Sequence, residues 1–282
     1  PFFPVGHSIL LGATIDGREG FVILDTGAPM LILNAQHFSG SPDLSAGQPV
    51  IGLNGPARST ATTHASLHLG ELVWKNEYAR LYDLTHLEAT KKVTILGLLG
   101  TGLFRDYELI IDAAAHQLHF VRLDPHGRPL DPDDAYTAPD LILPLKRKGH
   151  LPYVEAGVGD QRLRLGIDSG AGVAVLRRDR QTRLRPFLEV AKTIQVRGIS
   201  GDSQALPAVW LHELTLGDLP FPPQKVVLTR LRSIDQLLGG PELDGLLGFE
   251  FLRQYRTAIN FRKREIRLWA PAHAPLPRMA GQ

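Results

Sequence analysis

Short stretches of alternating apolar and polar residues, separated by glycine-containing turns, dominate the chain. Residues 9–15 and 18–24 are two such stretches, and the Asp16-Gly17 pair between them is typical of a tight β-hairpin. The pattern recurs later in further pairs of stretches, at 109–112 with 118–122, 153–158 with 161–167, and 257–260 with 265–269. This spacing of short strands and turns predicts an all-β protein.

Helical periodicity is confined to short segments. The best helical candidates are residues 103–107 and 251–255, each of which follows a Gly-Leu-Leu-Gly sequence. Residues 124–140 contain four prolines and five aspartates, which predicts an exposed linker. Residues 271–282 are rich in proline and alanine and are expected to form a loose tail.

The chain contains an internal repeat that indicates two copies of one module. Three strings recur in the same order: 25–28 (Asp-Thr-Gly-Ala) at 168–171, 52–55 at 198–201, and 97–100 (Gly-Leu-Leu-Gly) at 245–248. The offset grows from 143 to 146 to 148 positions, as small loop insertions would make it. We therefore expect two lobes, residues 1–123 and 141–270, joined by the linker.

Composition and charge narrow the class of protein. The 282 residues include 28 glycines and 21 prolines, which agrees with many turns, and no cysteine, which excludes disulfides and thiol chemistry. The formal net charge is +2 and no basic run is interleaved with aromatic residues, so nucleic-acid binding is not expected. The longest apolar stretch, 93–104, is too short and glycine-rich to span a membrane. Because the chain starts at Pro1 rather than Met, one interpretation is that an upstream segment such as a signal peptide was removed.

The repeated Asp-[Ser/Thr]-Gly-Ala string carries the strongest chemical signal. In each copy an apolar strand runs into a carboxylate, Asp25 or Asp168. A single copy would be interpreted as an ordinary turn, since Asp and Thr bond backbone amides and Gly accepts a positive φ. Two copies at equivalent positions favour a two-fold arrangement in which both carboxylates face one cleft. Such a pair holds one shared proton, so one member can act as a base on water while the other donates to a carbonyl oxygen.

The neighbours of the two aspartates have expected supporting roles. The hydroxyl groups of Thr26 and Ser169 could brace the two strands by hydrogen bonds across the pair. Gly27 and Gly170 let backbone amides approach the carboxylates. Ala28 and Ala171 follow at matching positions.

These motifs resemble the aspartic peptidases, specifically a bacterial-type retropepsin-like branch. The resemblance covers about residues 5–123 and 141–270, and Ala28 and Ala171 are similar to the residues of retropepsins, whereas the two fused lobes are similar to pepsins. It implies the acid-protease fold, with two pseudo-two-fold-related β-barrel lobes and a short helix in each. The apolar-apolar-Gly elements that pair beneath the aspartate loops in this family would be 98–100 and 246–248.

The resemblance also implies a mobile β-hairpin flap over the cleft. The matching strings lie where flaps belong, and the candidates are Gly52, Leu53, Asn54 and Gly55 in the first lobe and Gly198, Ile199, Ser200 and Gly201 in the second. An ordinary hairpin is the alternative interpretation. Neither string contains the tyrosine characteristic of pepsin flaps.

Other candidate sites are weaker. His7 and His150 match across the repeat and are expected to cap hairpins rather than to bind metal. The pairs His64 with His68 and His116 with His119 lack an accompanying carboxylate cluster, so we expect no metal and no cofactor. A Gly-x-Ser-x-Gly motif is absent, so a serine triad has no support.

The sequence thus predicts an aspartic endopeptidase that hydrolyses extended polypeptides and works as a monomer with both lobes in one chain. The first alternative is a catalytically silent peptide-binding module, which the retention of both aspartates disfavours. The second is an enzyme whose lobes pair between two chains. A periplasmic or secreted location is the expectation for the compartment.

Overall fold

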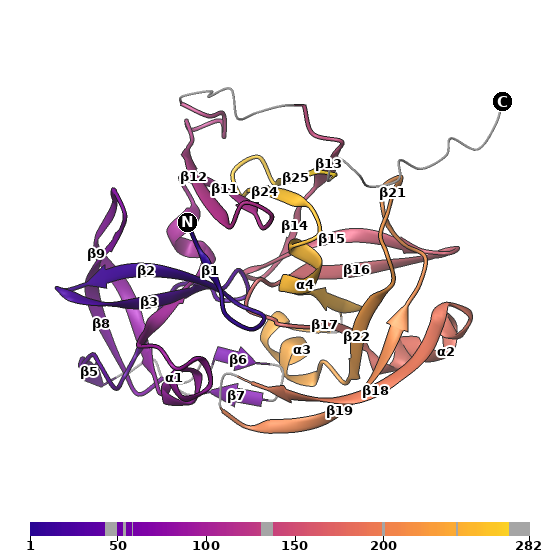
Figure 1. The fold of residues 1–282 in the computed structure, drawn as a ribbon, viewed down its shortest axis with the longest axis horizontal. Coiled ribbons are helices and arrows are strands. Elements are labelled where there is room, and N and C mark those ends of the chain that lie inside the picture. Colours follow the sequence, from indigo (N-terminus) through magenta and orange to yellow (C-terminus); the bar gives the residue numbers. More distant parts are fainter. Residues whose placement is uncertain are drawn as a thin grey trace.

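The structure is a computed structural model that describes residues 1–42, 50–52, 55–57, 59–130, 138–198, 201–240 and 242–270. The all-β prediction is confirmed, because strands dominate and helices are few and short. Two strand-built halves lie side by side and share a further sheet between them (Figure 1).

The N-terminal half is built around a closed six-stranded barrel. Its strands run in the order β2-β3-β10-β4-β9-β8, and β8 pairs again with β2 to close the ring. The short strands β1 and β5 extend the sheet at its two ends. The bounds are β1 Phe3–Pro4, β2 Ile9–Ile15, β3 Arg18–Leu24, β4 Leu31–Asn34, β5 Ser41–Pro42, β8 Ala61–Leu69, β9 Leu72–Tyr82 and β10 Ile95–Leu99.

The C-terminal half repeats this strand order. Its sheet contains the path β15-β16-β23-β17-β22-β19, and β15 pairs with β20 where β2 pairs with β8 in the other half. Strands β18, β21 and β14 complete the sheet. The bounds are β14 Lys146–Lys148, β15 Leu151–Val158, β16 Gln161–Ile167, β17 Ala174–Arg177, β18 Leu188–Arg197, β19 Ser203–Leu211, β20 Leu214–Leu216, β21 Leu219–Pro220, β22 Gln224–Thr229 and β23 Gly245–Leu247.

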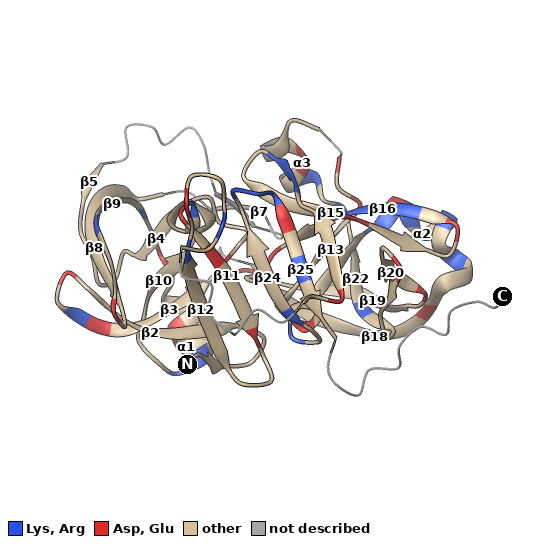
Figure 2. Cartoon of the chain, turned by 90° about the horizontal axis from the view of Figure 1, so that it is seen from above, with Lys and Arg blue, Asp and Glu red and all other residues tan. Residues whose placement is uncertain are grey.

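A five-stranded sheet joins the two halves. Its order is β12-β11-β24-β25-β13, and the antiparallel pair β11–β24 brings a strand of each half into contact (Figure 2). The bounds are β11 Tyr107–Asp112, β12 Gln117–Arg122, β13 Leu141–Pro144, β24 Arg256–Asn260 and β25 Glu265–Trp269. Backbone hydrogen bonds therefore fix the halves relative to each other.

The helices differ in part from the sequence prediction. The predicted segments 103–107 and 251–255 begin two residues earlier, as the 3-10 helix η1 (Thr101–Phe104) and the helix α4 (Phe249–Leu252), because Gly100 and Gly248 are themselves the extended residues that precede them. The sequence analysis missed α1 (Thr85–Lys91) and α3 (Arg232–Leu238), which are only seven residues long and end in a left-handed residue. Short turns η2 (Arg178–Arg180), α2 (Gln181–Leu184) and η3 (Arg185–Phe187) follow β17.

The core is continuous across the two halves. One cluster of buried apolar side chains includes Leu24 and Leu99 of the N-terminal half together with Ile167 and Leu247 of the C-terminal half. Smaller apolar clusters lie beside α1 and α3, one in each half. The strand ends that carry the two Asp-[Ser/Thr]-Gly-Ala strings therefore rest on a shared apolar base.

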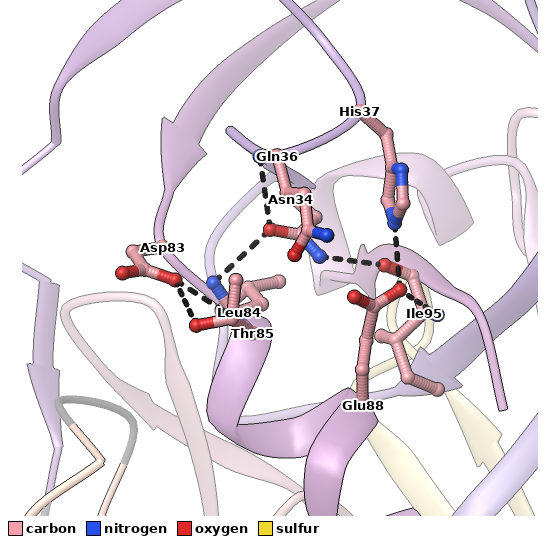
Figure 3. A network of polar contacts seen from close by, with 8 residues as sticks. All are labelled: Asn34, Gln36, His37, Asp83, Leu84, Thr85, Glu88 and Ile95. Atoms are coloured by element: carbon pink, nitrogen blue, oxygen red, sulfur yellow. Dashed lines mark hydrogen bonds and ion pairs between the residues drawn. The ribbon is translucent and has the colours of Figure 1, made fainter. Parts of the chain in front are cut away.

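A polar network anchors α1 to the barrel beside this base (Figure 3). The buried amide of Asn34 donates to the carbonyl oxygen of Ile95 at 3.1 Å and accepts from the amide of Leu84 at 3.2 Å. Glu88 of α1 contacts His37 at 2.6 Å and accepts from the backbone amide of Ile95 at 2.8 Å. These bonds satisfy backbone groups that would otherwise be buried unpaired.

The structure describes part of the expected linker, residues 124–130 and 138–140, and none of the expected tail. Residues 124–130 form a compact turn in which Asp124 accepts from the amides of His126 and Arg128. Residues 131–137 and the expected tail 271–282 lie outside the described residues. Across the described part of the chain, no helix has the length and apolar character needed to cross a membrane.

Candidate active site

Two equivalent strand ends carry Asp25 and Asp168. Strand β3 runs parallel to β10, and the amide of Asp25 donates to the carbonyl oxygen of Leu99 at 3.0 Å. Strand β16 runs parallel to β23, and the amide of Asp168 donates to Leu247 at 3.0 Å. The predicted Leu-Leu-Gly elements thus lie beside the two aspartate loops.

Each aspartate is held by the turn that follows it. Oδ1 of Asp25 accepts from the backbone amides of Gly27 and Ala28 at 2.9 and 3.2 Å. Oδ1 of Asp168 accepts from Gly170 and Ala171 at the same 2.9 and 3.2 Å. The alanines have no hydroxyl, so no side chain at these positions donates to the carboxylates.

The two carboxylates lie against the opposite loops. A Cβ atom built on Gly27 would lie 2.6 Å from Oδ1 of Asp168, and one built on Gly170 would lie 2.5 Å from Oδ1 of Asp25. Any larger residue would collide with a carboxylate. Glycine at these two positions is therefore what allows the aspartates to meet.

The glycines that end the Gly-Leu-Leu-Gly strings are equally constrained. A Cβ on Gly100 would lie 2.2 Å from the carbonyl oxygen of Met30, and one on Gly248 would lie 2.2 Å from that of Ala171. The backbone amide of the following residue donates to a carbonyl oxygen of the aspartate loop in each half. Thr101 donates to Ala28 at 2.9 Å, and Phe249 donates to Ala171 at 2.8 Å. These contacts hold both loops in one conformation.

Thr26 and Ser169 form a crossed set of hydrogen bonds beneath the carboxylates. Their backbone amides each donate to the other's hydroxyl, at 3.0 Å from Thr26 and 2.9 Å from Ser169. Each hydroxyl then donates to a backbone carbonyl of the opposite half, from Thr26 to Ile167 and from Ser169 to Leu24, both at 2.9 Å. Both residues are fully buried. The two loops are therefore locked to each other across the interface.

The environment favours the protonated form of this carboxyl pair. Burial, followed by the charge of Asp168, raises the pKa of Asp25 well above its usual range. Burial also raises the pKa of Asp168, although the amides of Gly170 and Ala171 oppose the shift. Two carboxyl groups in this arrangement titrate as one unit that retains a shared proton.

His7 and His150 do not cap their own hairpins, so that expectation is wrong. Nε2 of His150 lies 2.9 Å from the carbonyl oxygen of Gly27, in the aspartate loop of the other half. His7 lies against Gly172 beyond the second aspartate loop, and its Nδ1 is 2.7 Å from Glu250. The sequence showed that the two histidines occupy matching repeat positions. It did not show their partners, because these lie in the other half of the chain.

The flap candidates lie at hairpin tips, in part outside the described residues. Strands β6 (Val50–Gly52) and β7 (Gly55–Ala57) pair with Gly52 opposite Gly55, and Leu53 and Asn54 are not among the described residues. The hairpin β18–β19 turns through Gly198 and Gly201, where Ile199 and Ser200 likewise fall outside.

Each hairpin tip approaches a helix of the opposite half. Strand β6 contacts α3 (Figure 1). A Cβ on Gly201 would lie 3.2 Å from the ring of His86 in α1, and Arg197 donates to Thr90 of α1 at 2.8 Å. Each hairpin therefore contacts the opposite half of the molecule.

A pocket of about 680 Å³ adjoins the second aspartate loop. Gly172 and Val173 form one side, strand β18 contributes Ile194 and Val196, and Trp210 of β19 adds an apolar wall. The pocket thus lies between Gly172, which follows the second aspartate loop, and the β18–β19 hairpin, and it has room for a side chain of a bound ligand.

No described group of three or more His, Asp or Glu side chains is placed to hold a metal ion. The chemistry that the site offers is that of two adjacent carboxyl groups with one shared proton, fixed by backbone amides and bordered by a pocket.

Comparison with known families agrees with this arrangement. Residues 154–251 match the sequence model of a family described as Aspartyl protease. The matched stretch includes Asp168 and its loop, the β18–β19 hairpin and the second Gly-Leu-Leu-Gly string. The match, which lies within the C-terminal half, supports a relation to an aspartyl protease family.

Proposed function

We propose that the protein is an aspartic endopeptidase in which Asp25 and Asp168 activate a water molecule between them. The observation that supports this most directly is the reciprocal geometry of the two loops, in which each carboxylate lies against the glycine of the other loop. An ordinary Asp-containing turn has no need of such close approach, whereas a shared proton requires it.

The chemistry follows from the two protonation states. The ionised carboxylate accepts a proton from water while the water oxygen attacks the peptide carbonyl carbon. The protonated carboxyl donates to the carbonyl oxygen, so that its developing negative charge is neutralised. When the tetrahedral intermediate collapses, a proton passes to the amide nitrogen, the C–N bond breaks, and a carboxylic acid and an amine are released.

The rest of the site fits an extended polypeptide substrate. We infer that the hairpins with tips at 52–55 and 198–201 act as two flaps, whose backbone groups can pair with an extended chain. The equivalent loops and the shared strand order support a duplicated, retropepsin-like module, and joining both copies in one chain allows a monomer to be active.

The main alternative is a peptide-binding module without catalytic activity. Loss of one aspartate would favour it, but both carboxylates and the amides that hold them are in place. A pair of chains exchanging halves is a further alternative, which the oligomeric state in solution decides: full activity in a sedimenting monomer excludes it.

The decisive test is digestion of an unfolded protein by the wild type, Asp25→Asn and Asp168→Asn. Each substitution removes the shared proton or the base, so the cleavage rate should fall at least about a thousandfold in both variants. Thermal unfolding serves as the control that each variant is folded. Unchanged cleavage in both folded variants contradicts the proposal, and no cleavage by a folded wild type favours the binding module.

The pH dependence gives a second test of the same pair. The rate should fall at low pH, where both carboxyls are protonated, and again at high pH, where both are ionised. Because burial raises the pKa of Asp25 and of Asp168, both limbs should lie at less acidic pH than in a pepsin. Ala28 and Ala171 act in the same direction, since a hydroxyl donor there would lower the pKa of the pair. A sharp optimum at about pH 2 contradicts this expectation.

A further inference from the structure

Two pockets lie at equivalent places beside the two aspartate loops, yet their charges differ. The positions paired by the repeat are Pro29 with Gly172, Gly102 with Glu250, Arg105 with Arg253, and His150 with His7. In the C-terminal half, Glu250 neutralises its surroundings, because it contacts Nε of Arg253 and Nδ1 of His7, both at 2.7 Å.

The N-terminal half lacks this carboxylate. Gly102 stands where Glu250 stands in the other half, and no described carboxylate forms an ion pair with Arg105. His150 is directed to the carbonyl oxygen of Gly27 instead. Burial, with the nearby charge of Arg147, lowers the pKa of His150, so this ring is neutral at pH 7 and adds no charge of its own.

Further basic side chains surround the same pocket. Arg147, from β14, also has no ion-pair partner among the described carboxylates, and Arg262, from the turn between β24 and β25, is paired with Asp106. Arg105, Arg147 and Arg262 thus line a pocket of about 150 Å³, and of the three only Arg262 is paired with a described carboxylate. A space of this size accommodates a single carboxylate group, and the planar guanidinium is well suited to bind one.

We propose that this pocket, beside the loop that carries Asp25, binds a carboxylate of the peptide substrate, and that the equivalent pocket of the C-terminal half does not. The inference rests on the proposed function and assigns a direction to the bound peptide. Its position follows from His150, which lines the pocket and contacts the loop that carries Asp25. The carboxylate is either the side chain of an Asp or Glu residue or the free C-terminus of the peptide.

The test uses fluorescent decapeptide pools that contain one Glu or one Gln at each position in turn and are otherwise free of acidic residues. Matched pools with a C-terminal carboxylate or amide form a second arm. The wild type should cleave the Glu pool about three- to tenfold faster than the Gln pool at one position, and the preference should weaken as salt is added. A preference confined to the free C-terminus identifies end recognition instead of a side-chain subsite.

The matched variants are Arg105→Gln with Arg147→Gln, and Arg253→Gln as the control at the equivalent position of the other half. The double variant should bring the ratio of Glu to Gln cleavage close to one, whereas Arg253→Gln should retain the wild-type ratio. A ratio that is unchanged in the double variant, or lost equally in Arg253→Gln, overturns the proposal.

A binding measurement separates this inference from the proposed function. The same labelled pools are titrated against the folded Asp25→Asn variant, with and without the two arginine substitutions, and binding is measured by fluorescence anisotropy. An arginine-dependent preference for Glu without cleavage by the wild type sustains the pocket and refutes the peptidase. Cleavage by the wild type without any such preference sustains the peptidase and refutes the pocket, and the absence of both cleavage and binding refutes both.

Discussion

The two halves use different side chains at the ends of strands β4 and β17 to hold the neighbouring segment of the chain and the adjacent helix. Asn34 and Arg177 occupy positions paired by the repeat, and both bond to equivalent carbonyl oxygens, those of Ile95 and Leu243. In the N-terminal half the acid of the adjacent helix, Glu88, contacts His37 instead (Figure 3). In the C-terminal half Arg177 itself binds the helix acid.

The comparison shows that one guanidinium makes the contacts that several side chains share in the other half. Arg177 is buried and its two terminal nitrogens bond both oxygens of Asp235, at 2.7 and 2.5 Å. These bonds raise the pKa of Arg177 above its usual value, so the charge is fixed at any working pH. The C-terminal half therefore depends on a single residue, whereas the N-terminal half distributes the same function over Asn34, His37 and Glu88.

The largest expected effect is that of removing the ion pair between Arg177 and Asp235. Arg177→Leu leaves Asp235 without its partner in a mostly buried place, which should cost about 3–5 kcal/mol of unfolding free energy. Asn34→Ala leaves backbone groups of Ile95 and Leu84 unpaired, which should cost about 1–3 kcal/mol. Thermal unfolding measures both, since each kcal/mol lowers Tm by about 2–4 °C in a chain of this size.

A second substitution distinguishes the ion pair from general loss of packing. The double variant Arg177→Leu with Asp235→Leu removes both charges, so it should recover a large part of the lost stability. Equal losses for Arg177→Leu and Asn34→Ala, or no recovery in the double variant, would show that the two halves do not differ in this way.

Much of the fold was accessible from the sequence because its signals are local. The hairpin at Asp16-Gly17 and the strands 18–24, 161–167 and 265–269 follow from alternation and turn chemistry, and they appear with the predicted bounds. The helix α3 escaped notice because it is seven residues long and its stability depends on tertiary contacts, such as that between Asp235 and Arg177. Periodicity over such a length is too weak to identify a helix.

The residues of the candidate site likewise fall into those that the sequence identified and those that only the structure shows. The repeated string located both aspartates and the glycines beside them, because the repeat placed them at equivalent strand ends. The role of His150 and the basic pocket with Arg105 and Arg147 depend on contacts between segments more than forty positions apart. The repeat pairs Gly102 with Glu250, but only the spatial arrangement shows that Glu250 contacts His7 and Arg253 and that Arg105 has no such carboxylate among the described residues.

A smaller effect is expected where the halves are symmetric, at the crossed bonds of Thr26 and Ser169. Thr26→Val or Ser169→Ala each leaves one buried amide and one buried carbonyl unpaired, at a cost of about 2–4 kcal/mol. Since both substitutions disrupt one network, the double variant should lose less than the sum of the two, and Ser169→Thr, which keeps the hydroxyl, should lose little. Strict additivity in thermal unfolding, or a loss on one side alone, would show that the bonds act independently.

The smallest expected effect is at the surface, where the β18–β19 hairpin meets α1 of the opposite half. Thr90→Val removes the acceptor that Arg197 uses, and because this contact is exposed it should contribute only about 0.2–1 kcal/mol. If the hairpin is a flap that closes over a bound peptide, the lost contact should raise KM up to about fivefold while kcat changes little, since the carboxylate pair is untouched. Thr90→Ser keeps an acceptor and serves as the control. A change in kcat instead of KM would show that α1 supports the aspartate loops rather than the closed position of the hairpin.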